Sequence, residues 1–127
     1  MLIFDKTNAN ELIELLYNSY AHDSQLENIE YNWGEDSIKF ELFNTFFNSK
    51  LDLTFRNIRV MFTRKGNEYG SRTIVLSLSV EDDYSSLQTC LPEHNEYSKD
   101  SLYLLFQMFS GDELHIISKD VIVQLTK

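Results

Sequence analysis

The stretch Ile74-Val75-Leu76-Ser77-Leu78-Ser79-Val80 has the cleanest period-two pattern in the chain. Successive side chains of a β-strand point to opposite faces, so every second residue from Ile74 to Val80 would share one apolar face. The pattern therefore predicts a strand over 74–80 that buries this face against a core.

Similar patterns occur on both sides of this strand. Alternating apolar residues predict further strands, carried by Ile29, Tyr31 and Trp33; by Ile38, Phe40 and Leu42; by Leu51, Leu53 and Phe55; and by Ile58, Val60 and Phe62. The apolar parity shifts between Phe55 and Ile58, which predicts a β-bulge within one long strand. We expect residues 44–50 to form an irregular connection with an exposed tip.

The C-terminal part of the chain predicts more strands. Residues 102–109 are apolar on both faces, which favours a buried strand. A helix over 99–109 is the alternative, because short apolar runs are ambiguous. After a turn at 110–112, the apolar residues at 114, 116, 121, 123 and 125 predict a final strand, or a strand pair broken near Ser118-Lys119-Asp120.

Residues 8–21 predict the one helix. Leu12, Leu15 and Leu16 recur at helical spacing. Asn8 can cap the first turn, and Glu11 three positions later resembles a capping box. The polar His22-Asp23-Ser24 would then end the helix.

These elements predict an α+β fold that is mostly β. We expect an antiparallel sheet or sandwich of about six or seven strands, with the N-terminal helix packed on it. The links between neighbouring strands are short, which favours antiparallel pairing. The chain has 127 residues and no internal repeat or linker, so residues 1–127 are expected to form a single domain.

The charge balance excludes several classes of partner. Asp and Glu number 20 against 11 Lys and Arg, which gives a formal net charge of −9. Nucleic acids and anionic membranes bind clustered Lys and Arg, whereas the densest basic stretch, from Arg56 to Lys65, is interrupted by apolar residues. We therefore expect no nucleic acid and no membrane as partner, and an attraction to a basic protein.

The sequence also predicts a cytoplasmic protein. The N-terminus meets a charge at Asp5 and lacks the apolar run of a signal peptide. No stretch of about 18 apolar residues could span a membrane. The single cysteine, Cys90, permits no disulfide framework, which fits a reducing compartment.

No pattern in the sequence carries a complete catalytic or metal-binding set. The 4 glycines are too sparse for a phosphate-binding loop, and no G-x-S-x-G elbow occurs. His94 lies near Glu93 and Glu96 but lacks the spacing of a metal site. Glu81-Asp82-Asp83 lacks the glycine that a calcium loop would need. We therefore predict no catalytic residue, no metal and no cofactor.

His22 and Asp23 form a polar pair with two interpretations. A histidine beside a carboxylate can supply a general base or two metal ligands. The same pair suits a helix end, where a protonated histidine meets unpaired carbonyls and an aspartate bonds its own backbone. His115 is expected to point away from the side chains at 114 and 116, either packed on the sheet or toward solvent.

The remaining candidates are contacts to a partner. Phe46 and Phe47 are adjacent, so an extended chain cannot point both inward, and core filling and exposure both stay open. Trp33 with Tyr31 is expected in the core, with an exposed aromatic anchor as the alternative. The candidate contact residues are Phe46, Phe47, Tyr69, Glu81, Asp82, Asp83 and Glu93.

The order of short motifs resembles a group of small bacterial proteins. The chain carries His22-Asp23-Ser24 before Leu26, then Leu53-Thr54-Phe55-Arg56-Asn57-Ile58, and a strand–glycine turn–strand unit over 105–116. Proteins of this group begin with an HD-small-x-hydrophobic motif and carry an L-x-F-x-x-V strand, which Ile58 matches conservatively. Some of their families are classed as immunity proteins of polymorphic toxin systems. The resemblance implies an antiparallel β-rich fold and no catalytic residue.

Three functions remain open at this point. The first is a non-enzymatic soluble binding domain, whose most concrete form is an immunity-type protein that neutralises a basic toxin by direct contact. The second is a small-ligand carrier or enzyme with an apolar pocket between sheet and helix. The third is a homo-oligomer that pairs an apolar strand face across a two-fold axis.

Overall fold

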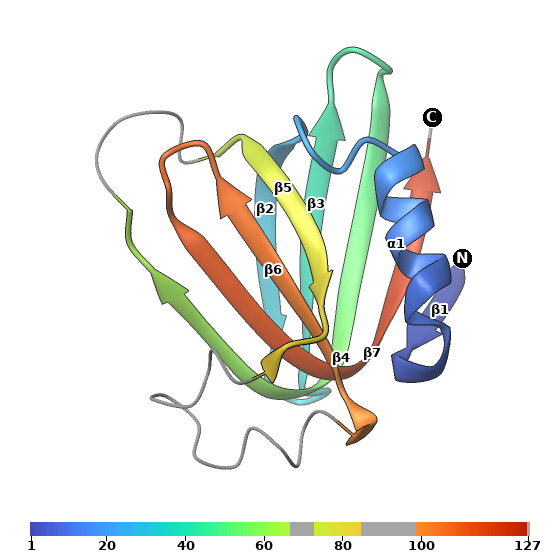
Figure 1. The fold of residues 1–127 in the computed structure, drawn as a ribbon. Helices are drawn as coiled ribbons and strands as arrows, with labels where there is room; N and C mark the ends of the chain where they lie inside the picture. The colour runs from blue at the N-terminus through green and yellow to red at the C-terminus, as the bar shows by residue number, and fades with distance from the viewer. Residues whose placement is uncertain (67–72, 85–98, 127) are drawn as a thin grey trace.

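The computed structural model describes residues 1–66, 73–84 and 99–126 (Figure 1). Within these residues the chain forms one α-helix, one short 3-10 helix and seven strands, which confirms the expected mostly β, antiparallel α+β fold. The elements are β1 (Leu2–Asp5), η1 (Lys6–Asn8), α1 (Ala9–Asn18), β2 (Gln25–Asn32), β3 (Ser37–Asn44), β4 (Ser49–Arg64), β5 (Val75–Glu81), β6 (Leu102–Met108) and β7 (Glu113–Thr126).

The strands form one sheet in the order β2-β3-β4-β7-β6-β5, and all neighbours are antiparallel. Strand β7 pairs with β4 along one side, and on the other side it pairs with two strands, β6 and β1. Its first half pairs with β6, and its second half pairs with β1. Helix α1 contacts both β1 and β5, so it covers the place where the sheet divides (Figure 1).

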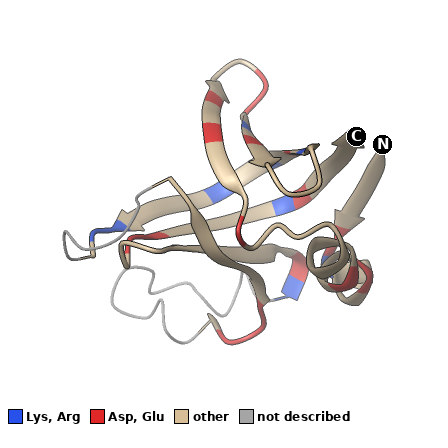
Figure 2. Cartoon of the chain, turned by 90° about the horizontal axis from the view of Figure 1, so that it is seen from above, with Lys and Arg blue, Asp and Glu red and all other residues tan. Residues whose placement is uncertain are grey.

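The sheet is strongly curled. Phe40 of β3 lies with its ring centroid 4.9 Å from that of Phe106 of β6, although β4 and β7 separate these strands in the sheet. The two end strands also meet where they begin: Gln25 forms a β-bridge with Ile74, and Val75 exchanges backbone hydrogen bonds with residues 23 and 24 at 2.7 and 2.8 Å. Two layers therefore enclose the core, and they join at one end (Figures 1 and 2).

The main core fills the space inside the curl. Leu12 and Leu16 of α1 pack there against buried residues of β3, β4, β6 and β7. A second, smaller cluster lies apart from it and contains Tyr84, Tyr103 and Ile117, with Val60, Phe62 and Leu105 packed against them. Both faces of β6 are therefore buried within one chain, which explains its continuous apolar sequence as a strand.

The helix is shorter than the predicted 8–21. It ends at Asn18 because Tyr20 adopts a left-handed backbone with φ of 56°. The N–H groups of Tyr20 and Ala21 then donate to the carbonyls of Tyr17 and Leu16, which is the Schellman pattern of a helix C-terminus. A tyrosine is unusual at this position, where glycine is preferred, so the sequence did not mark the helix end.

The predicted capping box at the helix start is wrong. The capping box belongs to η1, where Asp5 accepts from the backbone of Thr7 and Asn8 reaches back to the N–H of Asp5. The hydrogen bonds from Thr7, first that of its side chain and then that of its backbone, hold the pKa of Asp5 below its usual value. Asn8 makes no side-chain cap on α1.

The predicted bulge in β4 is present, slightly later than expected. Asn57 has a φ of 54°, and the register against β7 shifts between Ile58 and Val60. Of the two predicted alternatives for the C-terminal residues, the single final strand is confirmed and the pair broken near residues 118–120 is wrong, because β7 runs unbroken through them. Asp120 lies opposite Arg56 and binds its guanidinium at 2.7 and 2.8 Å, so these polar residues pair across the sheet.

The basic side chains of β3 and β4 are mostly neutralised by nearby carboxylates. Ion pairs join Lys39 and Lys50 to Glu41, Arg56 to Asp120, Arg59 to Asp100, and Arg64 to Glu113. Among the described residues, Lys and Arg are scattered and form no continuous block (Figure 2). In the same part of the chain, no helix is long and apolar enough to cross a membrane.

Candidate functional site

The turn between α1 and β2 carries His22 and Asp23. The His22 ring is half-buried and lies against two tyrosines, with ring centroids 5.8 Å from Tyr17 and 5.4 Å from Tyr20. Asp23 is exposed and adopts a φ of 68°, and its N–H donates to Val75 of β5. The two side chains are not hydrogen-bonded to each other, so the geometry assigns them to packing and to the turn.

The turn between β3 and β4 is fixed by one buried polar residue, Asn44. Its side-chain oxygen accepts from the N–H groups of Phe46 at 2.9 Å and Phe47 at 3.3 Å. Its side-chain nitrogen donates to the carbonyl of Tyr20 at 3.3 Å, which ties the turn to the end of α1. Asn44 thus places Phe46 and Phe47 next to the helix.

Both phenylalanines of this turn are exposed. Phe46 is 84% exposed and Phe47 is 53% exposed. The Phe47 ring stacks on Tyr20, with centroids 4.4 Å apart and an angle of 26° between the planes. Core filling is therefore wrong for this pair, and a contact to a partner remains a prediction.

Aromatic side chains from four segments converge around these two turns. We call this region the aromatic surface; it consists of Tyr17, Tyr20, His22, Phe46, Phe47 and Phe109. They come from α1, the α1–β2 turn, the β3–β4 turn and the end of β6. The structure therefore brings together His22 and Phe46–Phe47, which the sequence had proposed for different roles.

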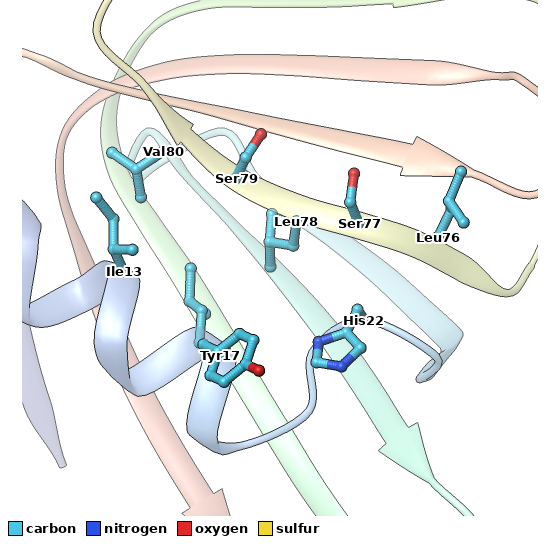
Figure 3. Close-up of a pocket in the computed structure, with 9 residues that line it drawn as sticks. Ile13, Tyr17, His22, Leu76, Ser77, Leu78, Ser79 and Val80 are labelled. Atoms are coloured by element: carbon cyan, nitrogen blue, oxygen red, sulfur yellow. The ribbon is translucent and has the colours of Figure 1, made fainter.

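Two open grooves adjoin the aromatic surface. The first, the helix–strand groove, has a volume of about 390 Å³ and lies between α1 and β5. Ile13, Leu16, Tyr17 and His22 line one wall, and residues 76–80 line the other (Figure 3). The second, the turn groove, has a volume of about 550 Å³ and is lined by Asp23, Gln25, Phe43, Thr45, Phe46, Ile74 and Phe109.

The acidic candidates lie elsewhere. Glu81 is the last residue of β5, and Asp82 and Asp83 follow it as exposed side chains, at the end of the strand away from Val75. They are therefore separated from the aromatic surface by the length of β5. Tyr69 and Glu93 lie outside the described residues, as do Cys90 and His94.

The acidic end of β5 is anchored by Tyr84. Its hydroxyl donates to the carbonyl of Ser101, and the ammonium of Lys6 lies 4.7 Å from the centre of its ring. Burial, followed by the influence of Tyr103 and of Asp100 and Asp82, raises the pKa of Tyr84 to about 12. Tyr84 therefore stays a neutral phenol at physiological pH.

Trp33 differs from the expectation that it fills the core. It is 84% exposed and lies just past the end of β2, with its ring 4.6 Å from that of Tyr31. Strand β2 is an end strand of the sheet, and the turn after it extends beyond the core. The alternation of Ile29, Tyr31 and Trp33 therefore marks the strand without burying all three residues.

His115 belongs to the group that most resembles a catalytic array. Its Nδ1 lies 2.6 Å from the hydroxyl of Tyr103, and its Nε2 lies 3.1 Å from a carboxylate oxygen of Glu113. Its ring also stacks on Phe62 with centroids 4.3 Å apart. Tyr103 is only 1% exposed. We assign this array to packing on the sheet, where both ring nitrogens have partners.

The described residues contain no group of three His, Cys, Asp or Glu side chains close enough to hold a metal ion. The aromatic surface can therefore bind a partner through apolar and aromatic contacts. Asn44 and Tyr20 are the positioning residues that sequence reasoning missed. An asparagine two positions before an exposed aromatic is a typical turn signal, so Asn44 could have been found.

Comparisons with known proteins bear on the fold alone. No protein-family model matches the chain, and no curated protein is similar to it in sequence. A solved structure of an uncharacterized protein from Neisseria gonorrhoeae is similar in fold, with a TM-score of 0.53 and 9% sequence identity. The match covers 84% of this chain and 92% of that one.

Proposed function

We propose that the protein is a non-enzymatic binding domain that receives another protein on its aromatic surface. The convergence of exposed aromatic rings from four segments carries this proposal. Contiguous exposed apolar side chains are costly in water and mark interaction sites in soluble proteins. Aromatic residues also dominate the binding energy of protein interfaces.

The charge of the chain favours a basic partner. The net charge is −9, and the exposed Glu11, Glu14, Glu27 and Glu30 make no ion pair within the described residues. A negative surface speeds encounter with a positive one. The narrower form of the proposal is an immunity-type protein that blocks a basic toxin by contact, which the motif resemblance supports.

A comparison of two exposed aromatic turns tests the proposal. The double variant Phe46→Ser with Phe47→Ser removes the rings of the β3–β4 turn, whereas Trp33→Ser removes an equally exposed ring from the β2–β3 turn. Tagged wild type is expected to capture one stoichiometric basic partner from a lysate of the source cells, and high salt should weaken the capture. The double variant should lose this partner, and Trp33→Ser should keep it. Equal capture by all three proteins would refute a role for the aromatic surface.

Asn44→Ala provides a finer test. It leaves both rings in the chain but removes the hydrogen bonds that orient them. Affinity should fall less than in the double variant, because the rings remain available without being held in place. An unchanged affinity would show that the orientation of the turn is irrelevant to binding.

The turn groove supports a second candidate function, the binding of a small ligand. Its volume of about 550 Å³ lies within the range of ligand sites, and Asp23 and Gln25 supply polar groups beside apolar walls. A thermal-shift screen of small molecules tests this candidate. A stabilising compound whose effect disappears in Phe109→Ser, but not in Trp33→Ser, would favour the ligand carrier.

A further inference from the structure

We propose that the partner enters the helix–strand groove as an extended segment and adds a strand to the free edge of β5. This inference rests on the proposed binding function and specifies how the partner is held. The segment would have an apolar centre and carry Lys or Arg toward its ends.

The lining of the groove shows that it follows the edge of β5. Five consecutive residues, from Leu76 to Val80, line it. Side chains of a strand alternate between faces, so a groove over one face would be lined by every second residue. Figure 3 shows the Leu78 side chain directed toward α1, whereas the hydroxyls of Ser77 and Ser79 point away from it. The element shared by all five residues is the backbone edge.

Among residues 1–66, 73–84 and 99–126, the backbone groups on this edge have no partner beyond Val75. Strand β5 is the last strand of the sheet order, with β6 on one side. Val75 is hydrogen-bonded to the α1–β2 turn on the other side, but within the part of the chain that the structure describes no such bond continues over residues 76–81. An exposed strand edge presents N–H and C=O groups that readily pair with an incoming chain.

Helix α1 supplies the opposite wall. Ile13, Leu16 and Tyr17 share one helix face, and Ile13 and Tyr17 are largely exposed, the latter to 72%. Helix α1 also contacts β5 directly, on the side toward which Leu78 points, so an added strand would lie beside β5 and not between β5 and the helix. Peptides bind by strand addition to an exposed sheet edge of this kind. Backbone hydrogen bonds would then hold the segment, and its alternate side chains would contact the helix.

Charge at both ends of the groove selects a basic segment. A smaller hollow of about 230 Å³ continues the groove past Ile13 and Val80 and is lined by Glu81 and Asp82. Lys6 also lines it, but its ammonium lies over the ring of Tyr84. Asp23 is exposed at the other end, directly after His22. Among the described residues, the carboxylates around the groove therefore outnumber the one cation, which suits Lys or Arg on the occupant.

A displayed library of random ten-residue peptides tests this inference with the intact chain. Selection should enrich peptides with alternating apolar residues and basic ends. Synthetic peptides with single backbone N-methyl groups then report the pairing. Methylation at every second position should weaken binding at least about tenfold, and methylation between them should have little effect, since alternate N–H groups face the strand. Amide exchange of residues 76–81 should slow in the complex.

Substitutions separate the groove from the rest of the aromatic surface. Tyr17→Ala, on the exposed helix wall, should weaken peptide binding at least about tenfold, as expected for an interface tyrosine. The double variant Glu81→Gln with Asp82→Asn should weaken it about threefold and reduce its salt dependence. Trp33→Ser, in the β2–β3 turn, lies outside both the groove and the aromatic surface and serves as the control, with affinity for the short peptide unchanged.

The outcomes distinguish this inference from the proposed function. If the selected peptides respond to Phe46→Ser but not to Tyr17→Ala, or if the N-methyl effects do not alternate, strand addition is wrong and binding on the aromatic surface stands. If no peptide binds, or if the chain dimerises through β5 in sedimentation experiments, strand addition by a partner is also wrong. If the peptide data support strand addition but the Phe46 and Phe47 double variant still captures the cellular partner, the proposed role of the β3–β4 turn in binding is wrong.

Discussion

The two end strands of the sheet, β2 and β5, are protected in different ways from unwanted pairing with another chain. Strand β2 has no buried residue and carries Glu27 and Glu30 as exposed side chains. Strand β5 begins with the fully buried Val75 and runs beside α1, with the helix–strand groove between them. Charged side chains discourage pairing at a strand edge. Strand β2 is therefore protected from edge pairing by its own charged residues, whereas access to β5 is restricted by a helix distant from it in the chain.

The two edge strands also meet at a hydrogen-bonded junction. This junction explains why the two edges have different surroundings. Val75 exchanges backbone hydrogen bonds with the α1–β2 turn, next to the start of β2. Beyond this point the strands diverge, so β2 faces solvent and β5 faces the helix. The junction therefore sets where the free part of β5 begins.

The largest expected effect is a break of this junction. Val75→Asp places a charge at a fully buried position, so the free energy of unfolding should fall by about 3 kcal/mol or more. If that variant does not fold, Val75→Ala should lose about 2 kcal/mol through lost burial and the cavity left behind. Chemical denaturation measures both values.

The matched control for the junction lies on the other edge. Ile29→Asp introduces the same charge on the exposed part of β2 and should change stability by no more than about 0.5 kcal/mol. Equal losses at both positions would remove the distinction between the closed junction and the free edge.

A smaller effect is expected at high pH, where the end of β5 near Tyr84 should lose stability and β2 should not. Tyr84 follows β5 and has a pKa raised to about 12, whereas its ordinary value is 10. Below about pH 10 the phenol is neutral in both states, so its stabilisation is fully present. As the pH rises from 10 toward 12, the unfolded phenol ionises first and this stabilisation is lost. Amide protection, taken relative to the base-catalysed intrinsic exchange rate, should then fall at the end of β5 and stay unchanged in β2.

Tyr84→Phe isolates this contribution. The variant loses the hydrogen bond to the Ser101 carbonyl, which should cost about 1 kcal/mol at neutral pH. It should also show a smaller loss of stability than wild type between pH 10 and 12. Ser101→Ala keeps the accepting carbonyl and should follow wild type across this range. Identical pH profiles for wild type and Tyr84→Phe would contradict the assignment.

The smallest effect on stability concerns the protection of β2. Glu27→Gln with Glu30→Gln should leave the unfolding free energy within about 0.5 kcal/mol of wild type, because both side chains are exposed. The neutral edge should nevertheless self-associate at high concentration, which sedimentation equilibrium would detect. Glu11→Gln with Glu14→Gln removes the same charge from α1 and should not promote association. Association in both double variants would point to net charge alone as the cause.

The sequence predicted the elements better than their ends. Alternation located the cores of β3, β4 and β5, because a half-buried strand needs an apolar residue at every second position. The strand β6 was predicted from a run that is apolar on both faces. It placed the helix but missed its end at Tyr20, where tertiary contacts with Phe47 and hydrogen bonds to the Tyr20 carbonyl support an unfavourable backbone conformation. It missed β1, a four-residue strand defined by pairing with β7.

The candidate site was predicted only in pieces. Phe46 and Phe47 were identified as contact candidates, but their neighbours Tyr20 and His22 come from a segment more than 20 residues away. Glu81 and its acidic neighbours were grouped with them, yet the structure places these residues at the opposite end of β5. The spacing of apolar residues and the composition depend only on residues close together in the sequence. They therefore cannot show which distant segments converge in the fold.

The sequence by itself determined the fold class, the antiparallel pairing and the net negative charge, because each depends on local alternation, short connections or composition. The tertiary structure alone decided that the sheet curls until β2 and β5 meet, that Asn44 joins a turn to a helix end, and that β5 faces α1 across a groove. These features depend on hydrogen bonds and packing between residues far apart in the chain. Their energies are set by three-dimensional proximity, which no local pattern encodes.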